Sequence, residues 1–449
     1  MGRTAAIIAG AATADITPEG SVFLYGYPGV ERFSTGVHDR LRSSALFVSD
    51  GKTSLILVAN DCIYIGKATA VRARRRIEEQ TTVAAAHVMI TATHTHSGPV
   101  TADILSNAHD HVVPKADPAY LQRMEDGIVE AAVQAFRQAR AARVAFAVAD
   151  GSSVGGNRHD PCGPSDPQVP VMIVREENSA NYIALLAICS MHPTVLHEDS
   201  RLISGDFPAA TRRCLQERVV GPRCPILYHT GPCGNQSPRH VTRGNSFAEA
   251  ERLGGLLAEA IAAAMAAAVD EPESDSGGLQ LACRTASVAL PRRKLPSLAE
   301  ADDDLHSARR RFESLRRNGA PRAQVRTAEC DCFGAEESVA LAHAAAAGLV
   351  DTAFAAILPA EITAMRIGTR WLVGWPGETY IEFALAVKAR HPHCHLIGLA
   401  NGELQGYLVT AEAVRDRHYE ALNALLASPE SGELLVRATL ELLDKEALL

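Results

Sequence analysis

The chain has 449 residues, of which 47% are hydrophobic and 21% are charged, as in an ordinary globular protein. The 44 basic and 52 acidic residues give a formal net charge of −8 without a Lys/Arg-rich tract, which argues against a nucleic-acid partner. The sequence contains no run of about 18 apolar residues, so we expect no stable membrane insertion.

Strands and helices alternate along the first 150 residues. Apolar runs with period 2 and the turn signal at Asp50–Gly51 favour strands, whereas apolar residues spaced three and four apart favour helices. In chain order, these patterns predict strands over 5–17, 42–50 and 51–61, a helix over 67–79, a strand at 88–90, a helix over 120–142 and a strand over 143–150.

The rest of the chain continues in the same manner and includes a charged segment over 297–348. This segment resembles an inserted pair of helices joined by the turn "NGAP". Mixed strands and helices predict an α/β (α+β) fold, with a mixed sheet flanked by helices and a site at the strand ends. We expect a single domain over 1–449. The other predicted elements are strands starting near 182, 225, 362 and 395 and helices over 206–219, 247–269, 379–392 and 429–445.

Three histidines and a carboxylate are candidate metal ligands. His94 and His96 in "THTHSGP" follow a buried strand, and in an extended segment residues i and i+2 share a face. His192 ends another apolar strand, and Glu378 follows a Pro-Gly turn at a predicted helix start. Zinc binds such groups, but a polar loop, backbone-bonded histidines and a helix-start acid are equally simple interpretations of each residue alone.

Four further polar residues occupy similar positions. Ser237 in "GNQSP" lies in a Gly/Pro turn, and Arg158 in "GGNR" lies in a loop. Tyr407 and Tyr419 are either half-buried aromatics or part of a site. A turn serine and a surface arginine are common without any function, so these residues gain meaning only as a set.

Ten cysteines are scattered along the chain without a C-x-x-C pair, and several lie in apolar runs. This pattern is typical of buried free thiols. With no clear export signal at the start of the chain, we predict a cytoplasmic location.

The ordered motifs are similar to those of the neutral/alkaline, non-lysosomal ceramidase family. The resemblance extends over nearly the full length and covers the catalytic domain. The motifs are "ADITP", "GYPG", "GVHDRLRSSALFV", "THTHSGP", "GGNR", "MHPT", "ISGDFP", "GNQSP", "PGE", "GYLVTAEAV" and "HYEA".

The resemblance implies a role for each candidate residue. It implies a zinc site made by His94, His96, His192, Glu378 and Tyr407. It also implies that Ser237 has a catalytic role, as nucleophile or positioning hydroxyl, that Arg158 orients the substrate and that Tyr419 stabilises the oxyanion. The reaction it implies is hydrolysis of the amide bond of an N-acylsphingosine.

The chain departs from the family pattern at three positions of the serine motif. Asn235 replaces an aspartate, which changes the local charge near Ser237, and Gln236 and Arg239 also differ. We further expect that the chain lacks the C-terminal β-domain of typical ceramidases. With only 5% aromatic residues, we predict a zinc-dependent amidohydrolase for a small, soluble N-acyl or amide substrate.

Other functions stay open at this point. They are a true ceramidase, an ester or lactone hydrolase or acyl transferase with the same apparatus, and a non-catalytic zinc-binding protein. The sequence also leaves open whether the chain is a monomer or a homo-oligomer.

Overall fold

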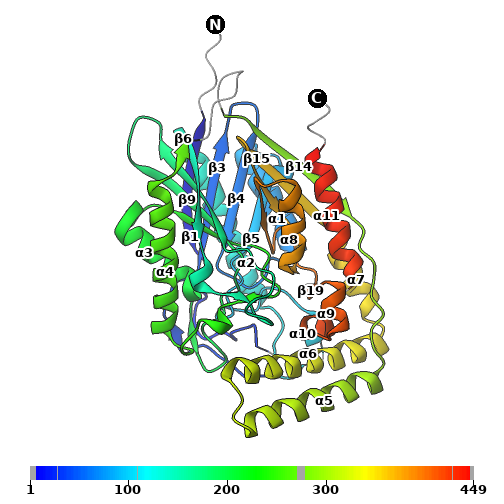
Figure 1. Ribbon diagram of the computed structural model, residues 1–449. Helices are drawn as coiled ribbons and strands as arrows, with labels where there is room; N and C mark the ends of the chain where they lie inside the picture. Colours follow the sequence, from blue (N-terminus) through cyan, green and yellow to red (C-terminus); the bar gives the residue numbers. More distant parts are fainter. Residues whose placement is uncertain (1–6, 28, 109, 271–278, 427, 445–449) are drawn as a thin grey trace.

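The computed structural model describes residues 7–27, 29–108, 110–270, 279–426 and 428–444. Two sheets form the interior, and helices cover their outer faces (Figure 1). The predicted α/β (α+β) class, a mixed sheet flanked by helices, is confirmed.

The larger sheet has nine strands within the described part of the chain, in the order β11-β9-β8-β6-β1-β3-β4-β5, with β13 beside β6. Its two halves meet at β1 and β6, which pair at only two positions. The strands are β1 (Ile8–Asp15), β3 (Arg42–Ser49), β4 (Ser54–Asn60), β5 (Val88–Ala92), β6 (Arg140–Asp150), β8 (Gln168–Glu176), β9 (Tyr182–Cys189), β11 (Ile226–Thr230) and β13 (Val269–Asp270).

Strand β4 shows why these segments are almost continuously apolar. Leu55 and Leu57 face the interior between the sheets, while Ile56 and Val58 face the helices outside. Because successive side chains alternate between faces, a strand covered on both sides buries every residue. All four of these side chains are fully buried.

The smaller sheet shares this interior with the larger one. Met365 and Ile367 pack in the same apolar cluster as Leu55 and Leu57 of the larger sheet. The smaller sheet has the order β14-β15-β16-β18, and its strands are β14 (Leu281–Val288), β15 (Ala360–Ile367), β16 (Arg370–Gly374) and β18 (Cys394–Ile397).

Three groups of helices cover the sheets. Helices α1 and α2 cover β1, β3, β4 and β5, α3 and α4 cover the other half of the larger sheet, and α8 and α11 cover the smaller sheet. Capping residues define several of their starts, for example Asp117, which accepts a hydrogen bond from the Ala119 N–H and is followed by Pro118. The helices are α1 (Lys67–Thr81), α2 (Pro118–Arg137), α3 (Asp206–Leu215), α4 (Phe247–Ala266), α8 (Ile381–Arg390) and α11 (Pro429–Asp444).

The helix predicted over 120–142 is too long. Helix α2 ends at Arg137, because residues 140–142 pair as the first part of β6. Apolar residues continue across this boundary, so their spacing alone does not mark it.

The charged segment forms a helical hairpin, as predicted. Ser297 and Glu300 form a capping box at its start, and helices α5 and α6 pack against each other below the sheets in Figure 1. The helices of this region are α5 (Leu298–Arg317), α6 (Arg322–Ala346), α7 (Val350–Ile357), α9 (Ala411–Arg415) and α10 (Tyr419–Asn423).

Parallel strand pairs bring the candidate motifs to one region. Strand β5 pairs in parallel with β4, β11 with β9, and β18 with β16. The carboxyl ends of parallel neighbours reach the same edge of a sheet, and ligand sites of α/β proteins commonly form there. All the candidate loops except "GGNR" and "HYEA" follow one of these strands.

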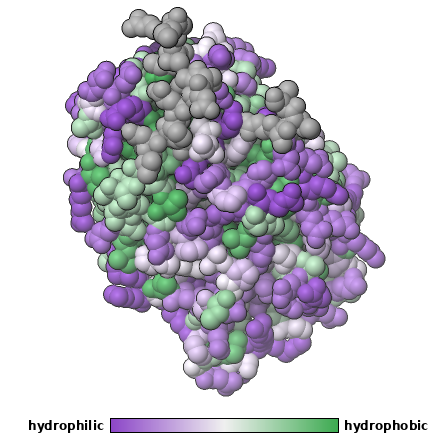
Figure 2. Space-filling view, turned by 45° about the horizontal axis from the view of Figure 1, so that its top comes forward, coloured by the Kyte–Doolittle hydropathy of each residue, from purple (hydrophilic) through white to green (hydrophobic). Residues whose placement is uncertain are grey.

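The face in Figure 2 intermingles hydrophilic and hydrophobic residues. In the described part of the chain, no single helix is long and apolar enough to span a membrane, although α6 and α7, bent by 107°, meet the length and composition criteria as a pair.

Candidate functional site

The three candidate histidines converge at one point with Glu378. The His94 Nε2 lies 3.1 Å from the His192 Nε2 and 3.3 Å from the His96 Nε2. One oxygen of Glu378, Oε2, lies 3.0 Å from the His192 Nε2 and 3.2 Å from the His94 Nε2. His94, His192 and Glu378 are all buried.

The outer nitrogens of the three rings are held by backbone carbonyls. The Nδ1 of His94 lies 2.9 Å from the Ile63 oxygen, and the Nδ1 of His96 lies 3.0 Å from the Gly26 oxygen. The Nδ1 of His192 lies 2.7 Å from the Cys233 oxygen. Because a carbonyl only accepts, each Nδ1 carries a proton, and each ring in its neutral form directs the lone pair of its Nε2 inward.

The ionisation of these groups favours a cation at their centre. Burial lowers the pKa of His192 to about 4, and burial together with His94 lowers that of His96, so both rings are neutral near pH 7. Burial raises the pKa of Glu378, but its contacts with His94 and His192 outweigh this effect and hold the pKa well below the ordinary value. The carboxylate and the three Nε2 atoms therefore form a group of ligands suited to a cation.

The ligand set fits zinc. Zinc bonds to His nitrogen and carboxylate oxygen at about 2.0–2.1 Å, so two ligand atoms at a tetrahedral ion lie about 3.3 Å apart. The observed separations of 3.0 to 3.3 Å agree with this value. The three histidines thus form a candidate metal-binding group.

The backbone brings His94 and His96 together in a way that the sequence interpretation did not foresee. We expected an extended segment in which both rings share a face. Instead, His94 has a left-handed backbone with φ of 66°, and its ring is perpendicular to that of His96. A non-glycine residue in this region costs about 1–3 kcal/mol, and such strain is concentrated at functional sites.

Glu378 and Tyr407 are direct neighbours across a short parallel bridge. They pair in register between β17 (Glu378–Thr379) and β19 (Tyr407–Leu408). Glu378 therefore lies in a strand bridge, and the expectation that it begins a helix is wrong, because α8 starts three residues later. Burial, together with Glu378, raises the pKa of Tyr407 and keeps its phenol protonated in the absence of a cation.

Tyr64 is a site residue that the sequence interpretation missed. Its hydroxyl donates a hydrogen bond of 2.9 Å to Oε1 of Glu378, the oxygen that does not face the histidines. Tyr64 follows β4, the parallel neighbour of β5, and so emerges at the same sheet edge as "THTHSGP". That adjacency is the signal that would have identified it.

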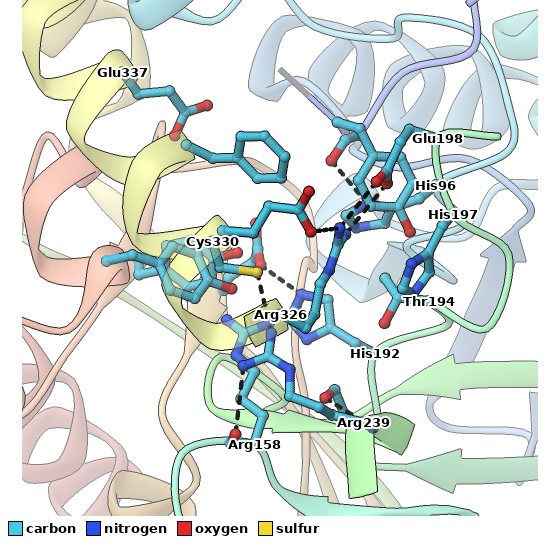
Figure 3. Close-up of a pocket in the computed structure, with 18 of the residues that line it drawn as sticks. His96, Arg158, His192, Thr194, His197, Glu198, Arg239, Arg326, Cys330 and Glu337 are labelled. Atoms are coloured by element: carbon cyan, nitrogen blue, oxygen red, sulfur yellow. Dashed lines mark hydrogen bonds and ion pairs between the residues drawn. The ribbon is translucent and has the colours of Figure 1, made fainter. Parts of the chain in front are cut away.

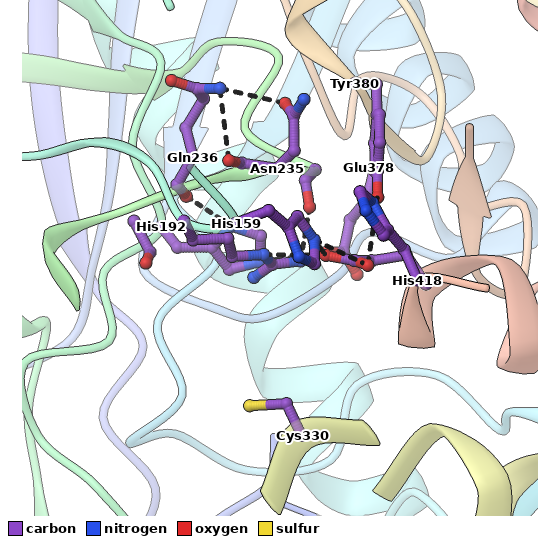
Figure 4. A network of polar contacts seen from close by, with 12 residues as sticks. His159, His192, Asn235, Gln236, Cys330, Glu378, Tyr380 and His418 are labelled. Atoms are coloured by element: carbon purple, nitrogen blue, oxygen red, sulfur yellow. Dashed lines mark hydrogen bonds and ion pairs between the residues drawn. The ribbon is translucent and has the colours of Figure 1, made fainter. Parts of the chain in front are cut away.

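Arg158 is held by a buried carboxylate, Glu420. The Nε of Arg158 donates to Glu420 at 2.8 Å, and its Nη2 lies 2.7 Å from the same oxygen. His159 and Tyr380, which Figure 4 labels within one polar network, also contact Glu420, at 2.9 and 3.0 Å. The guanidinium carbon lies 4.9 Å from the ring centre of Tyr419, so the network fixes Arg158 against this tyrosine.

A cavity of about 390 Å³ opens onto these groups (Figure 3). Seven of the eight predicted residues line it, and His94 lies behind them, fully buried. Helix α6 of the charged hairpin forms one wall. The seven residues are His96, Arg158, His192, Ser237, Glu378, Tyr407 and Tyr419.

The first half of the chain is similar to a known protein family. Residues 8–223 match the family profile described as neutral/alkaline non-lysosomal ceramidase, N-terminal. The match covers a little under half of the chain. No curated protein matches the chain.

Two solved ceramidase structures share the fold. The neutral ceramidase from Pseudomonas aeruginosa aligns with 97% of this chain and 74% of its own chain, with a TM-score of 0.74 and 21% sequence identity. A structure described as ceramidase complexed with C2 aligns over the same shares, with a TM-score of 0.73 and 18% identity. The predicted resemblance to this family is therefore confirmed.

The three departures from the ceramidase serine motif have different surroundings. The side-chain amide of Asn235 accepts a hydrogen bond from the Ile381 N–H at 3.0 Å and donates one to Glu382 at 2.8 Å. It therefore bonds to the first residues of α8. Gln236 donates to the Pro164 carbonyl at 3.0 Å. Of the three, only Arg239 lines the cavity.

Proposed function

We propose that this ceramidase-like chain is a zinc-dependent hydrolase of amide bonds. The observation that carries the proposal is the convergence of three Nε2 lone pairs and an ionised carboxylate at the base of a cavity. We propose His94, His96, His192 and Glu378 as ligands, with Tyr407 as a further ligand beside Glu378. A bound zinc ion would supply a Lewis acid and a water whose pKa is lowered to about 7.

Tyr419 is the proposed donor to the oxygen that gains charge as the amide carbonyl is attacked. Burial raises its pKa although Arg158 opposes this, so the hydroxyl keeps its proton and can donate. Loss of one such donor typically costs about 10²- to 10³-fold in rate. Arg158 lies against the Tyr419 ring and has the planar fork needed to orient a polar substrate group.

Ser237 acts in this proposal by positioning the substrate. Its Oγ accepts a hydrogen bond of 3.3 Å from the Arg239 N–H. No described histidine or carboxylate lies within hydrogen-bond distance of this hydroxyl, and a nucleophilic serine needs such a base. In the overall reaction, the oxygen of water bonds to the carbonyl carbon, the C–N bond breaks, and the amine nitrogen takes a proton.

We propose a small, polar amide as the substrate. The cavity wall carries charged residues of both signs, including Glu198 and Arg326, which favours a polar ligand. A second candidate is N-acylsphingosine, because the family and both solved structures are named as ceramidases.

The test combines metal content with hydrolysis of a substrate panel. We expect about one zinc per chain and release of amine from short N-acyl compounds in preference to ceramides. His192→Ala should lose both zinc and activity, whereas His393→Ala, at an exposed position, should keep both. Full activity after complete metal removal would contradict the proposal. Turnover of ceramides alone would support the second candidate. Zinc binding without turnover of any amide would support a non-catalytic role. Turnover of esters alone would show that the reaction is ester hydrolysis.

A further inference from the structure

Two arginines of the cavity, Arg239 and Arg322, form no ion pair with an acid in the described part of the chain. A third cavity arginine, Arg326, does form ion pairs, 3.0 Å from Glu198 and 2.7 Å from Glu329. These two acids satisfy Arg326 and are not bonded to any other arginine in the described part of the chain. The remaining cavity arginines, besides Arg158, are Arg239 and Arg322.

Arg239 contacts only neutral groups. Its guanidinium donates to the Arg158 carbonyl at 3.4 Å, to the Thr327 hydroxyl at 3.1 Å and to the Cys330 sulfur at 3.2 Å. Arg322 likewise donates to the Thr242 carbonyl and the Asn245 amide oxygen. Among the described residues, no Asp or Glu oxygen lies within 4.0 Å of either guanidinium.

Arg239 lies beside the proposed reaction centre. Its backbone N–H donates to Ser237, and its guanidinium reaches the backbone of Arg158. Figure 3 shows Arg239 and Arg158 together on one side of the cavity and Glu337 on the opposite side. Arg239 is half-buried, whereas Arg322 is exposed at the start of α6, so the two cations extend from the cavity wall to the solvent.

We propose that Arg239 binds a carboxylate of the substrate and that Arg322 strengthens this site. The inference rests on the proposed amide hydrolysis and names its substrate class as amides that carry a carboxylate, such as N-acyl amino acids. The fork of a guanidinium matches a carboxylate with two parallel hydrogen bonds. Of the three departures from the ceramidase serine motif, only Arg239 lines the cavity. The change in sequence therefore lies where a change in substrate would be recognised.

The experiment compares N-hexanoyl amino acids with their carboxamides, which differ only in the charge of the terminal group. Release of hexanoate is measured for both. We expect the wild-type protein to prefer the carboxylate by about 10- to 100-fold in kcat/KM, the effect of one charge-assisted pair. Arg239→Gln should remove most of this preference by lowering kcat/KM for the carboxylate more than for the carboxamide, and Arg322→Gln should reduce the preference less.

Two further variants separate recognition from folding. Arg239→Lys keeps the charge but loses the fork, so it should give an intermediate preference. Arg310→Gln, on the exposed face of α5 and outside the cavity, should keep the full preference. Calorimetry of the metal-free protein adds a measurement without turnover, in which the N-acyl amino acid should bind wild type more tightly than Arg239→Gln.

The outcomes distinguish failure of this inference from failure of the proposed function. Equal turnover of carboxylate and carboxamide would overturn the carboxylate site and leave the amide hydrolase standing. An equal loss on both substrates in Arg239→Gln would show that Arg239 is structural. Lack of turnover of any amide by the zinc-loaded protein would overturn both proposals.

Discussion

Replacement of Glu420 by Gln is expected to separate the orientation of Arg158 from metal binding. Glu420 has no exposed side-chain surface and contacts Arg158, His159 and Tyr380 at 2.7 to 3.0 Å. Glutamine keeps the shape of the side chain but removes its charge. The Arg158 guanidinium, only 4% exposed, would then be a buried cation without a counter-ion.

The expected loss of stability follows from this burial. Breaking a buried ion pair by removing one partner costs about 3–5 kcal/mol. With about 2.1 cal/mol/K of unfolding entropy per residue, a chain of this length loses about 1 °C in Tm per kcal/mol, so Tm should fall by about 3–5 °C. A misplacement of Arg158 by about 1 Å would lower kcat by about 10²-fold.

The assay is thermal unfolding combined with steady-state kinetics and elemental analysis. Zinc content should stay at the wild-type value, because Glu420 is not among the proposed ligands. Glu412→Gln, at an exposed position of α9, is the matched control and should change stability by less than about 0.5 kcal/mol. An unchanged Tm and kcat in Glu420→Gln would refute the reasoning.

Three other perturbations test different parts of the structure. Gly26→Ala should displace His96 and reduce zinc content, because the new Cβ would collide with its Nδ1. Gly20→Ala, also at a positive φ but with no neighbour within 4 Å, is the control and should keep its zinc. Retained zinc in Gly26→Ala would contradict the expectation. Tyr64→Phe should weaken zinc affinity by about 10- to 100-fold in a competition titration, and an unchanged affinity would exclude Tyr64 from supporting Glu378. Burial lowers the pKa of His229 and His395 to about 3, so below pH 6.5 the unfolded chain binds more protons than the folded chain. The free energy of unfolding should therefore fall as the pH falls from 6.5 toward 3, by up to about 1.4 kcal/mol per pH unit for each histidine. A pH-independent stability in urea over this range would show that these rings are not buried as neutral groups.

Most strands and helices were predictable, because the covering of the sheets leaves a direct trace in the sequence. Strand β4 is apolar at every position from Leu55 to Ala59, since both of its faces are buried. The end of α2 was not predictable, because burial continues from the helix into β6 and the apolar pattern does not change there. Burial therefore reveals that a segment is internal more clearly than it reveals where one element ends.

The site was predictable as a set of strand ends but not as a geometry. Parallel pairing explains why His94 and His192 emerge toward the same region. The left-handed backbone at His94 and the carbonyl partners of each ring depend on tertiary packing and leave no local pattern. Glu420 was overlooked for a related reason, since its partners Arg158 and His159 are about 260 residues away in the sequence.

The buried pair of Arg158 and Glu420 is better explained by function than by stability. Taking two charges out of water costs several kcal/mol for each ion, and apolar replacements of buried pairs are often neutral or stabilising. The double variant Arg158→Met/Glu420→Gln should therefore lose less stability than the sum of the single variants, with a coupling of about 0.5–3 kcal/mol. It should still lack the activity that depends on an oriented guanidinium. Recovery of stability without recovery of kcat would therefore show that the pair serves to orient Arg158. Additive losses of stability would show that the two side chains act independently and that the network does not position Arg158.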